Sequence, residues 1–276
     1  MGQVAFWSNR YGQSGNSTNM IAVATLIGME YVTRTLISHT HWSMSSLEST
    51  FLKGKTSTVN DIEYSNVGID ALERLARSNR LTPNMVKDYA DTILRDRLEL
   101  LRGTAKPNEE MFSSIHDVIE SILDTVKGYY NLSLIDVSSG TQNELTNIVL
   151  ATSDVIVVNL NQNIAVLEEF FDHEQPDFLK EKQYVIVLGQ YDRHSKYSVS
   201  NIKRMYKPNA PIFTVPHCTG FMDALNDKSV VEFFLRNKNI GGNHDNHYFM
   251  AEVRKLAKGI FEAAGVDTKI YSEQGA

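Results

Sequence analysis

The chain has 276 residues, of which 42% are hydrophobic and 22% are charged, which is typical of a globular protein with a sizeable core. Its formal net charge of −6 disfavours a nucleic-acid binder that works by charge alone, because such proteins are usually basic. The single cysteine, Cys218, excludes an intramolecular disulfide and a multi-cysteine metal site, and we expect it to be a small semi-buried apolar residue. Residues 1–25 lack the basic start and apolar core of a signal peptide, and no run of about 18 apolar residues occurs, so we expect a cytoplasmic protein.

Short apolar runs alternate with segments of helical periodicity along the chain. The runs predict strands at residues 3–8, 35–40, 98–102, 132–137, 155–160, 184–188 and 211–215. The periodicity predicts helices at residues 17–33, 61–79, 112–126, 144–152, 164–171, 221–226, 229–235 and 248–264, with one more opening at Thr82-Pro83. Because unbroken apolar strands separated by helices indicate a parallel sheet buried on both faces, we predict one α/β domain over residues 1–276. Its mostly parallel sheet would carry helices on both faces, as a three-layer sandwich.

A glycine-containing loop, GQSGNST at residues 12–18, joins the first predicted strand to the first predicted helix. Phosphate-binding loops occupy this setting: main-chain N–H groups hold the anion, and a lysine and a hydroxyl serve the terminal phosphate and Mg²⁺. Gly12 and Gly15 permit the tight turn, and Ser17 stands where the metal-binding hydroxyl would be. However, Asn16 takes the place of the lysine, and Arg10 stands where the strict pattern has glycine. The motif alone also fits an ordinary turn in which Asn16 or Ser17 is the helix N-cap.

A second segment carries more information. Residues 129–159 read YYNLSLIDVSSGTQNELTNIVLATSDVIVVN, so that a strand ends on Asp136 and is followed by a turn, a helix and another strand. This order resembles the MinD/ParA family of P-loop proteins, which carry a deviant Walker-A loop. The turn at residues 137–140 resembles the second switch of that family, although serines replace its usual prolines. Residues 4–27, 184–191 and 211–226 also resemble the family, and the resemblance spans about residues 3–262.

The resemblance implies a P-loop NTPase fold of the SIMIBI class and a site for ATP or ADP with Mg²⁺, and neither zinc nor haem is expected. It implies that Ser17 and Asp136 would hold the metal, and that Asp136 and His41 would be catalytic residues if the protein were an active ATPase. The residues that it implies for nucleotide binding are Gly12, Gln13, Ser14, Gly15, Asn16, Ser17, Thr18, Asp136, Gln190 and Pro216.

The chain departs from the family pattern at its charged positions. The signature lysine falls on Tyr11 and the general phosphate lysine on Asn16, while Arg10 stands beside the first position as a partial substitute. The acidic positions of the first switch fall on His39 and His41. Losing one charged hydrogen bond of about 1.5–3 kcal/mol weakens binding roughly ten- to hundredfold. A missing cation costs phosphoryl transfer about 10³–10⁵ in rate, so we expect little or no hydrolysis.

Two further features of the sequence are candidate sites. Five histidines suggest zinc, but no HxxxH or Cys/His framework supports it, so a polar surface or interface role is expected for His39, His41, His217, His244 and His247. The last predicted helix carries basic residues opposite its apolar stripe (Arg254, Lys255, Lys258). We expect it to pack on the sheet rather than to enter lipid, although peripheral contact with the inner membrane face or the cell pole is an alternative.

Within the family, the chain looks most like TadZ/CpaE-type Flp pilus assembly proteins with a degenerate phosphate loop. The resulting hypothesis is a cytoplasmic homodimeric pseudo-ATPase that positions or assembles an envelope machine, such as a Tad/Flp pilus or a secretion system. One alternative is an active ATPase that uses Arg10 and groups from a partner. Another is a DNA- or plasmid-partitioning ATPase, against which the acidic net charge counts.

Overall fold

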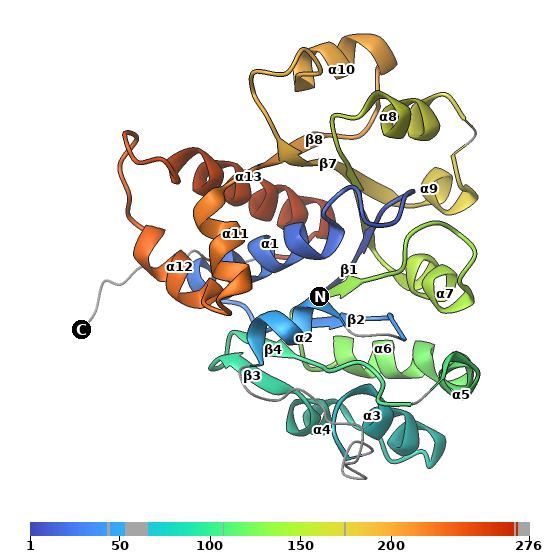
Figure 1. Ribbon diagram of the computed structural model, residues 1–276. Helices are drawn as coiled ribbons and strands as arrows, with labels where there is room; N and C mark the ends of the chain where they lie inside the picture. The colour runs from blue at the N-terminus through green and yellow to red at the C-terminus, as the bar shows by residue number, and fades with distance from the viewer. Residues whose placement is uncertain (43–44, 53–65, 107, 174, 268, 270–276) are drawn as a thin grey trace.

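A computed structural model describes residues 1–42, 45–52, 66–106, 108–173, 175–267 and 269. An eight-stranded sheet forms its middle layer, in the order β3-β4-β2-β5-β1-β6-β7-β8 (Figure 1). All neighbours are parallel except β3 and β4, which are antiparallel. The strands are β1 (Gly2–Trp7), β2 (Thr35–His39), β3 (Asp91–Leu94), β4 (Leu98–Leu100), β5 (Leu132–Asp136), β6 (Val155–Leu160), β7 (Gln183–Tyr191) and β8 (Ile212–Pro216).

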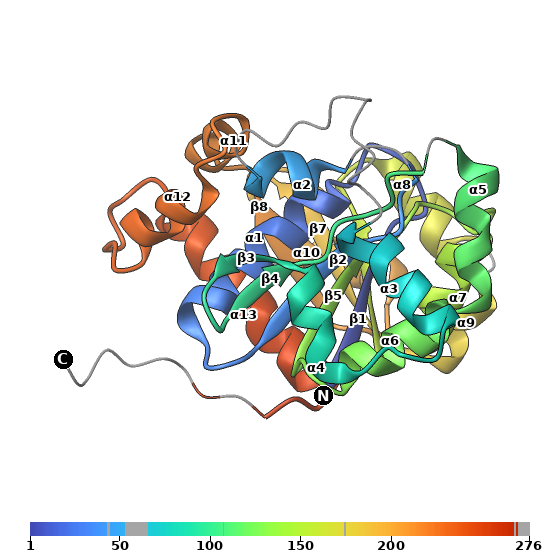
Figure 2. The same cartoon turned by 90° about the horizontal axis from the view of Figure 1, so that it is seen from below.

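Helices cover both faces of the sheet, so the predicted fold class is confirmed (Figures 1 and 2). Side chains alternate along β1, with Val4 and Phe6 in one core layer and Ala5 and Trp7 in the other. The first layer lies under α1 (Asn16–Glu30), α2 (Ser46–Phe51), α11 (Thr219–Asn226), α12 (Val230–Asn237) and α13 (His247–Ala264). The second lies under α3 (Gly68–Arg77), α4 (Pro83–Val86), α5 (Glu109–Ser113), α6 (Ile119–Lys127), α7 (Glu144–Thr152), α8 (Ile164–Phe171), α9 (Asp177–Glu181) and α10 (Val199–Tyr206), with 3-10 turns η2 (Lys87–Tyr89) and η3 (Ser114–Asp117).

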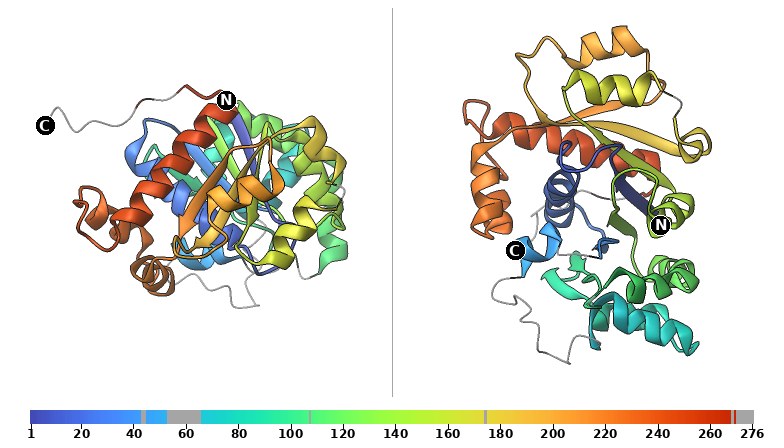
Figure 3. Two further views of the ribbon diagram at one scale, coloured as in Figure 1. Left: turned by 90° about the horizontal axis from the view of Figure 1, so that it is seen from above. Right: turned by 45° about the vertical axis from the view of Figure 1, so that its right-hand side comes forward.

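The helices α8 and α10 lie at one end of the sheet and α3 and α4 at the other (Figure 3). Four elements were not predicted: β3, α2, α9 and α10. Each is short and buries few side chains; α10, for example, buries only Ile202. The predicted helix 112–126 is divided among α5, η3 and α6, and that at 61–79 appears as α3, with residues 61–65 outside the described part. A short apolar periodicity fixes the type of an element better than its ends.

The last helix, α13, packs on the sheet as predicted. Val253, Leu256 and Ile260 are fully buried against the layer that contains α1. On its other side Arg254 forms a two-pronged ion pair with Glu30 at the end of α1. No helix among the described residues is long and apolar enough to cross a membrane. Cys218 is buried as expected, and this burial raises the pKa of its thiol.

The register of the central strands determines where the functional residues gather. Phe6 of β1 and His39 of β2 are both Cα partners of Asp136 on β5. The carboxyl ends of β1, β2 and β5 therefore lie side by side. In open α/β sheets ligands bind outside these carboxyl ends, where neighbouring connections diverge to opposite sides.

Candidate functional site

The loop between β1 and α1 turns on two glycines in the left-handed region, Gly12 with φ 73° and Gly15 with φ 69°. Gly15 is the N-cap of α1 and Asn16 is its first helical residue, so neither Asn16 nor Ser17 is the N-cap that the alternative of an ordinary turn assumed. A helix that begins in this way leaves its first main-chain N–H groups free of intrahelical partners. The loop and the start of the helix form one wall of a cavity of about 360 Å³, and the lining residues are Tyr11, Gly12, Ser14, Gly15, Asn16, Ser17, Thr18, His41, Ser45, Ser46, Asp136, Val137 and Ser139.

Both the nitrogen and the oxygen of the Asn16 side-chain amide form hydrogen bonds to residues of the sheet. Its Nδ2 donates to the Phe6 carbonyl oxygen at 2.8 Å and to Asp136 Oδ1 at 2.6 Å, and its Oδ1 accepts from Asn159 Nδ2. A lysine at this position would extend its ammonium toward a phosphate, whereas the Asn16 amide ends on the metal-type carboxylate. The neutral side chain therefore stabilises the loop against the sheet.

Asp136 is the buried charge of the site, with 1% of its surface exposed. Besides the bond from Asn16, its carboxylate accepts a hydrogen bond from the Ser17 hydroxyl, and His41 Nε2 lies 3.5 Å from its Oδ2. Ser17 and Asp136, the two residues that the resemblance implies for the metal, thus lie next to each other at the cavity wall. Hydrogen bonds from neutral donors and the nearby imidazole offset the cost of burying this charge.

Two asparagines that were not predicted as site residues extend this network. Asn159, at 0% exposure near the end of β6, joins Asn16 to Asn19 of α1, whose Nδ2 donates to Asn159 Oδ1 at 2.8 Å. Asn19 Nδ2 also lies 3.2 Å from the Ser14 carbonyl oxygen in the loop. The only signal available in the sequence was an asparagine near the end of the predicted strand 155–160, and its partner in space could not be read from spacing.

Among the described residues that line the cavity there is no lysine or arginine, and the ionisable side chains are those of Tyr11, His41 and Asp136. Arg10, expected as a partial substitute for a lysine, instead pairs with Glu169 of α8. Tyr11, at the signature-lysine position, is 84% exposed. The described part of the site therefore places a helix N-terminus beside a carboxylate, with neither lysine nor arginine between them.

His39, the last residue of β2, and His41, two residues further on, occupy different environments. Their rings stack with centroids 5.7 Å apart, but His39 is buried, so the expected surface role is wrong for it. His39 Nε2 lies 3.1 Å from Glu48 Oε1 on α2, and the Gly103 N–H donates to the same oxygen at 2.7 Å. Burial raises the pKa of Glu48. The hydrogen bonds from His39 and Gly103 and the charge of His39 lower it by more, so the pKa of Glu48 falls below its ordinary value. This contact fixes α2, whose N-terminal serines line the cavity.

The remaining expected residues do not line this cavity. Gln190 is exposed in the left-handed region (φ 49°), at the register shift between β7 and β8, and Pro216 is the last residue of β8. Gln13 belongs to the loop, where its main-chain oxygen accepts from Asn161. His217, His244 and His247 lie elsewhere, and no group of three or more metal-type side chains occurs in the described part of the chain.

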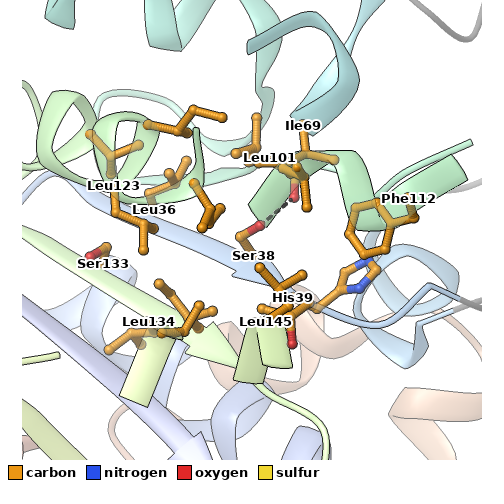
Figure 4. A pocket seen from close by; sticks show the side chains of 17 residues that line it. Leu36, Ser38, His39, Ile69, Leu101, Phe112, Leu123, Ser133, Leu134 and Leu145 are labelled. Atoms are coloured by element: carbon orange, nitrogen blue, oxygen red, sulfur yellow. Dashed lines mark hydrogen bonds between the residues drawn. The ribbon is translucent and has the colours of Figure 1, made fainter. Parts of the chain in front are cut away.

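A smaller cavity of about 30 Å³ lies inside the second core layer (Figure 4). Most of its lining is aliphatic, with Ser38 and Ser133 among the few polar residues. Ser38 Oγ donates to the Leu101 carbonyl oxygen at 3.1 Å, whereas Ser133 Oγ has no hydrogen-bond partner among the described residues. This space is large enough for water and far too small for a nucleotide.

The sheet order, the glycine loop between β1 and α1, and the aspartate that ends β5 define an α/β fold of the P-loop NTPase type. Among solved structures the fold is that of the ParA and MinD ATPases. A ParA family ATPase from Chlorobium tepidum is 15% identical, with a TM-score of 0.70 over 93% of this chain and 98% of that one. MinD of Pyrococcus horikoshii, complexed with Mg-ADP, is 14% identical with a TM-score of 0.69 over 96% and 98%. MinD in the MinC:MinD complex of Aquifex aeolicus is 14% identical with a TM-score of 0.64 over the full length of both chains. Neither sequence models of protein families nor curated protein sequences match the chain.

Proposed function

We propose that this protein is a ParA/MinD-like pseudo-ATPase: it binds ATP or ADP weakly, hydrolyses it little or not at all, and acts by positioning or assembling a larger machine. The observation that carries the proposal is the hydrogen bond of Asn16 to Asp136 in a cavity whose described lining residues include neither lysine nor arginine. Phosphoryl transfer depends on positioned charge, and the cost of losing a cationic group is about 10³–10⁵ in rate. Main-chain N–H groups at the start of a helix can still hold an anion without it.

The donors for a magnesium ion fit the site. Mg²⁺ prefers oxygen ligands, and the Ser17 hydroxyl and the Asp136 carboxylate are adjacent at the cavity wall. When bound with a nucleotide, the ion would supply positive charge that screens the phosphates. The loop from Gly12 to Thr18 would orient them, and Asn16 would keep the loop in place.

The biological role follows from the family resemblance and the lost cations together. A protein with a ParA/MinD-like fold that hydrolyses little ATP would not change state through hydrolysis. It is suited to a static scaffold, in which a nucleotide acts as a structural ligand. We propose a homodimer that helps to place or build an envelope machine, such as a Tad/Flp pilus or a secretion system, at the inner face of the membrane or at a cell pole. Among the neighbours, the MinC:MinD complex shows that a protein of this fold binds a partner protein.

Two measurements on the same preparation test this function. Isothermal titration with ATP and Mg²⁺ should give saturable weak binding, and phosphate release should stay at the level of the Asp136→Ala variant. Fast turnover that disappears in Asp136→Ala would instead identify an active ATPase, and no binding up to millimolar ATP would remove the nucleotide from the proposal. Arg10→Ala tests the alternative of an active ATPase that uses Arg10. Because Arg10 pairs with Glu169, we expect its loss to leave ATP binding unchanged.

Salt-dependent retention on duplex DNA would favour a partitioning role over assembly. We expect none at physiological salt.

A further inference from the structure

The strand β8 forms one edge of the sheet. It is the last strand in the order, and in the described part of the chain only β7 pairs with it (Figure 1). The Pro211 carbonyl oxygen accepts the Ile186 N–H of β7. Because successive residues of a strand turn their main-chain groups to alternate sides, those of Ile212 and Thr214 face away from β7. The outer side of β8 is therefore a row of donors and acceptors to which a further strand can pair.

A groove of about 410 Å³ lies between this edge and α13. Consecutive residues of β8, from Ile212 to Thr214, line one side of it. The other side is lined by one face of α13, at three- and four-residue spacing from Glu252 to Glu262. An edge strand beside a groove suits an extended peptide, because main-chain hydrogen bonds hold the peptide and the groove receives its alternate side chains.

The floor of the groove is apolar and is joined firmly to the strand. Gly259 lies inside α13, where glycine is unfavourable, and a Cβ there would come within 2.1 Å of the Phe213 ring. The glycine thus lets this partly exposed ring lie against the helix. The Thr214 hydroxyl donates to Glu252 Oε2 at 2.5 Å, and Glu252 Oε1 accepts from Lys255 Nζ at 2.5 Å. Strand and helix are therefore connected, and the groove is formed before any ligand binds.

The charges along the groove favour an acidic occupant. Two lysines lie in the middle of the helix face and a glutamate lies at each end. The side chains of Lys255 and Lys258 are 66% and 74% exposed, whereas Glu252 is 14% exposed and already bonded to Thr214. Lys258 and Glu262 are 3.6 Å apart and both exposed, a weak pair that a ligand can replace. An acidic side chain above the middle of the groove would therefore meet two accessible ammonium groups.

A second copy of the chain is a poorer occupant of this edge. Antiparallel pairing of two β8 strands would place the two α13 helices side by side about a two-fold axis, running in opposite directions. The glutamates at the ends of the helix face would then oppose each other, and so would the lysines in its middle. Like charges in these positions repel, so the edge is selective against its own copy.

We propose that β8 and α13 bind an extended segment of a partner protein as a ninth strand of the sheet. An acidic side chain of this segment lies over Lys255 and Lys258, and an apolar side chain of the same face packs on Phe213. Main-chain bonds to Ile212 and Thr214 provide affinity, and the two side chains provide selectivity. This groove shares no lining residue with the cavity at the end of β5. The inference therefore goes beyond the proposed function and does not depend on nucleotide binding.

The test titrates the full-length protein calorimetrically, without nucleotide, with the peptide acetyl-Thr-Val-Thr-Glu-Thr-Val-Thr-amide. Its valines and glutamate share one face of a strand. A matched peptide carries glutamine in place of glutamate, and we expect it to bind about tenfold more weakly. Two further peptides carry N-methyl groups on the third and fifth residues or on the fourth and sixth, so that each blocks one edge only.

We expect one methylated peptide to bind like the parent and the other not to bind, because only one edge of the peptide pairs with β8. Equal behaviour of the two methylated peptides would overturn the added strand. Equal binding of the glutamate and glutamine peptides would overturn the selection by charge, and no binding of any peptide would overturn the whole proposal.

Variants locate the binding. Lys255→Gln with Lys258→Gln should weaken the glutamate peptide about tenfold, and because both side chains are exposed their loss leaves the core intact. Lys87→Gln with Lys203→Gln removes the same charge from exposed positions outside the groove and should change nothing. Wild-type affinity in the groove variant would reject this location. A dimer in sedimentation that the peptide dissociates would assign the edge to a second copy and also overturn the proposal.

Discussion

The Asn16 amide donates to the Asp136 carboxylate at 2.6 Å, joining the start of α1 to the end of β5. The family resemblance implies a phosphate-binding role for the first position and a metal-binding role for the second. Here they serve each other, and Asn159 completes the arrangement from β6. The loop is therefore held in shape by its own hydrogen bonds, and a ligand would enter a site that is already formed.

Asn16→Lys should restore a cation to the loop. We expect ATP affinity to rise about tenfold or more, since a charged hydrogen bond is worth about 1.5–3 kcal/mol. Calorimetric titration with ATP and Mg²⁺ measures the change. The control is Asn226→Lys on α11, which adds the same charge on an exposed surface away from the cavity. Equal gains in both variants would point to net charge, and no gain would show that the lysine cannot reach the phosphate.

Gly189→Ala should disturb the loop from the side of β7. A Cβ at Gly189 would overlap the Ser14 carbonyl oxygen and press on the Asn19 amide. We expect a loss of about 1–3 kcal/mol in the free energy of unfolding, together with weaker nucleotide binding. Gly241→Ala, where a Cβ meets no atom within 4 Å, should be nearly neutral. Urea denaturation compares the two, and wild-type stability for Gly189→Ala would mean that the loop moves without cost.

Ser133→Ala and Ser38→Ala should have opposite effects although both serines line the same small cavity (Figure 4). Ser133 Oγ has no described partner, so its removal should stabilise the fold by about 1 kcal/mol. Ser38 Oγ donates to the Leu101 carbonyl oxygen, and its loss should destabilise by a similar amount, about 1 kcal/mol. Thermal unfolding of the two variants measures whether each substitution raises or lowers the stability. Destabilisation by Ser133→Ala would reveal an ordered water bound to that hydroxyl.

Glu73 of α3 holds together the loop after β4 and the start of η3. Its side chain, 6% exposed, accepts hydrogen bonds from Lys106, from Arg77 at 3.2 Å and from Ser114 at 2.7 Å. Glu73→Gln removes the charge from these bonds and should cost about 1.5–3 kcal/mol in the free energy of unfolding. Glu120→Gln, exposed on α6, should stay within about 0.5 kcal/mol of the wild type. Chemical denaturation at pH 7 measures the free energy of unfolding of both variants and of the wild type.

The same residue gives the stability a pH dependence. Burial raises the pKa of Glu73, but hydrogen bonds from Lys106, Ser114 and Arg77 and the charge of Lys106 outweigh it, so the pKa lies below the ordinary 4.5. The unfolded chain therefore binds the proton first as the pH falls. The contribution of Glu73 is complete above pH 4.5 and is lost as the pH drops through the lowered pKa. The difference in stability between wild type and Glu73→Gln should shrink in acid; a constant difference would contradict the assignment.

The sequence by itself determined the layers of the protein and the place of its site. Unbroken apolar runs such as 155–160 must be buried on both faces, which requires a parallel sheet between helices. Two glycines before a helix and an aspartate at a strand end mark the carboxyl edge as the candidate site, because the carboxyl ends of parallel strands meet at the same edge of a sheet. Short elements with few buried side chains, such as β3 and α10, left too weak a periodicity to be read.

Only the tertiary structure decided what the polar side chains do at that edge. Arg10 stands next to the loop in sequence but pairs with Glu169, 159 residues away. Asn16 and Asp136 are 120 residues apart and share a hydrogen bond. A side chain contacts whatever the packing of distant segments places near it, and hydrogen bonds act only over a few ångströms. Local sequence can therefore name the groups available for binding, while their partners and the charge of the cavity depend on the folded chain.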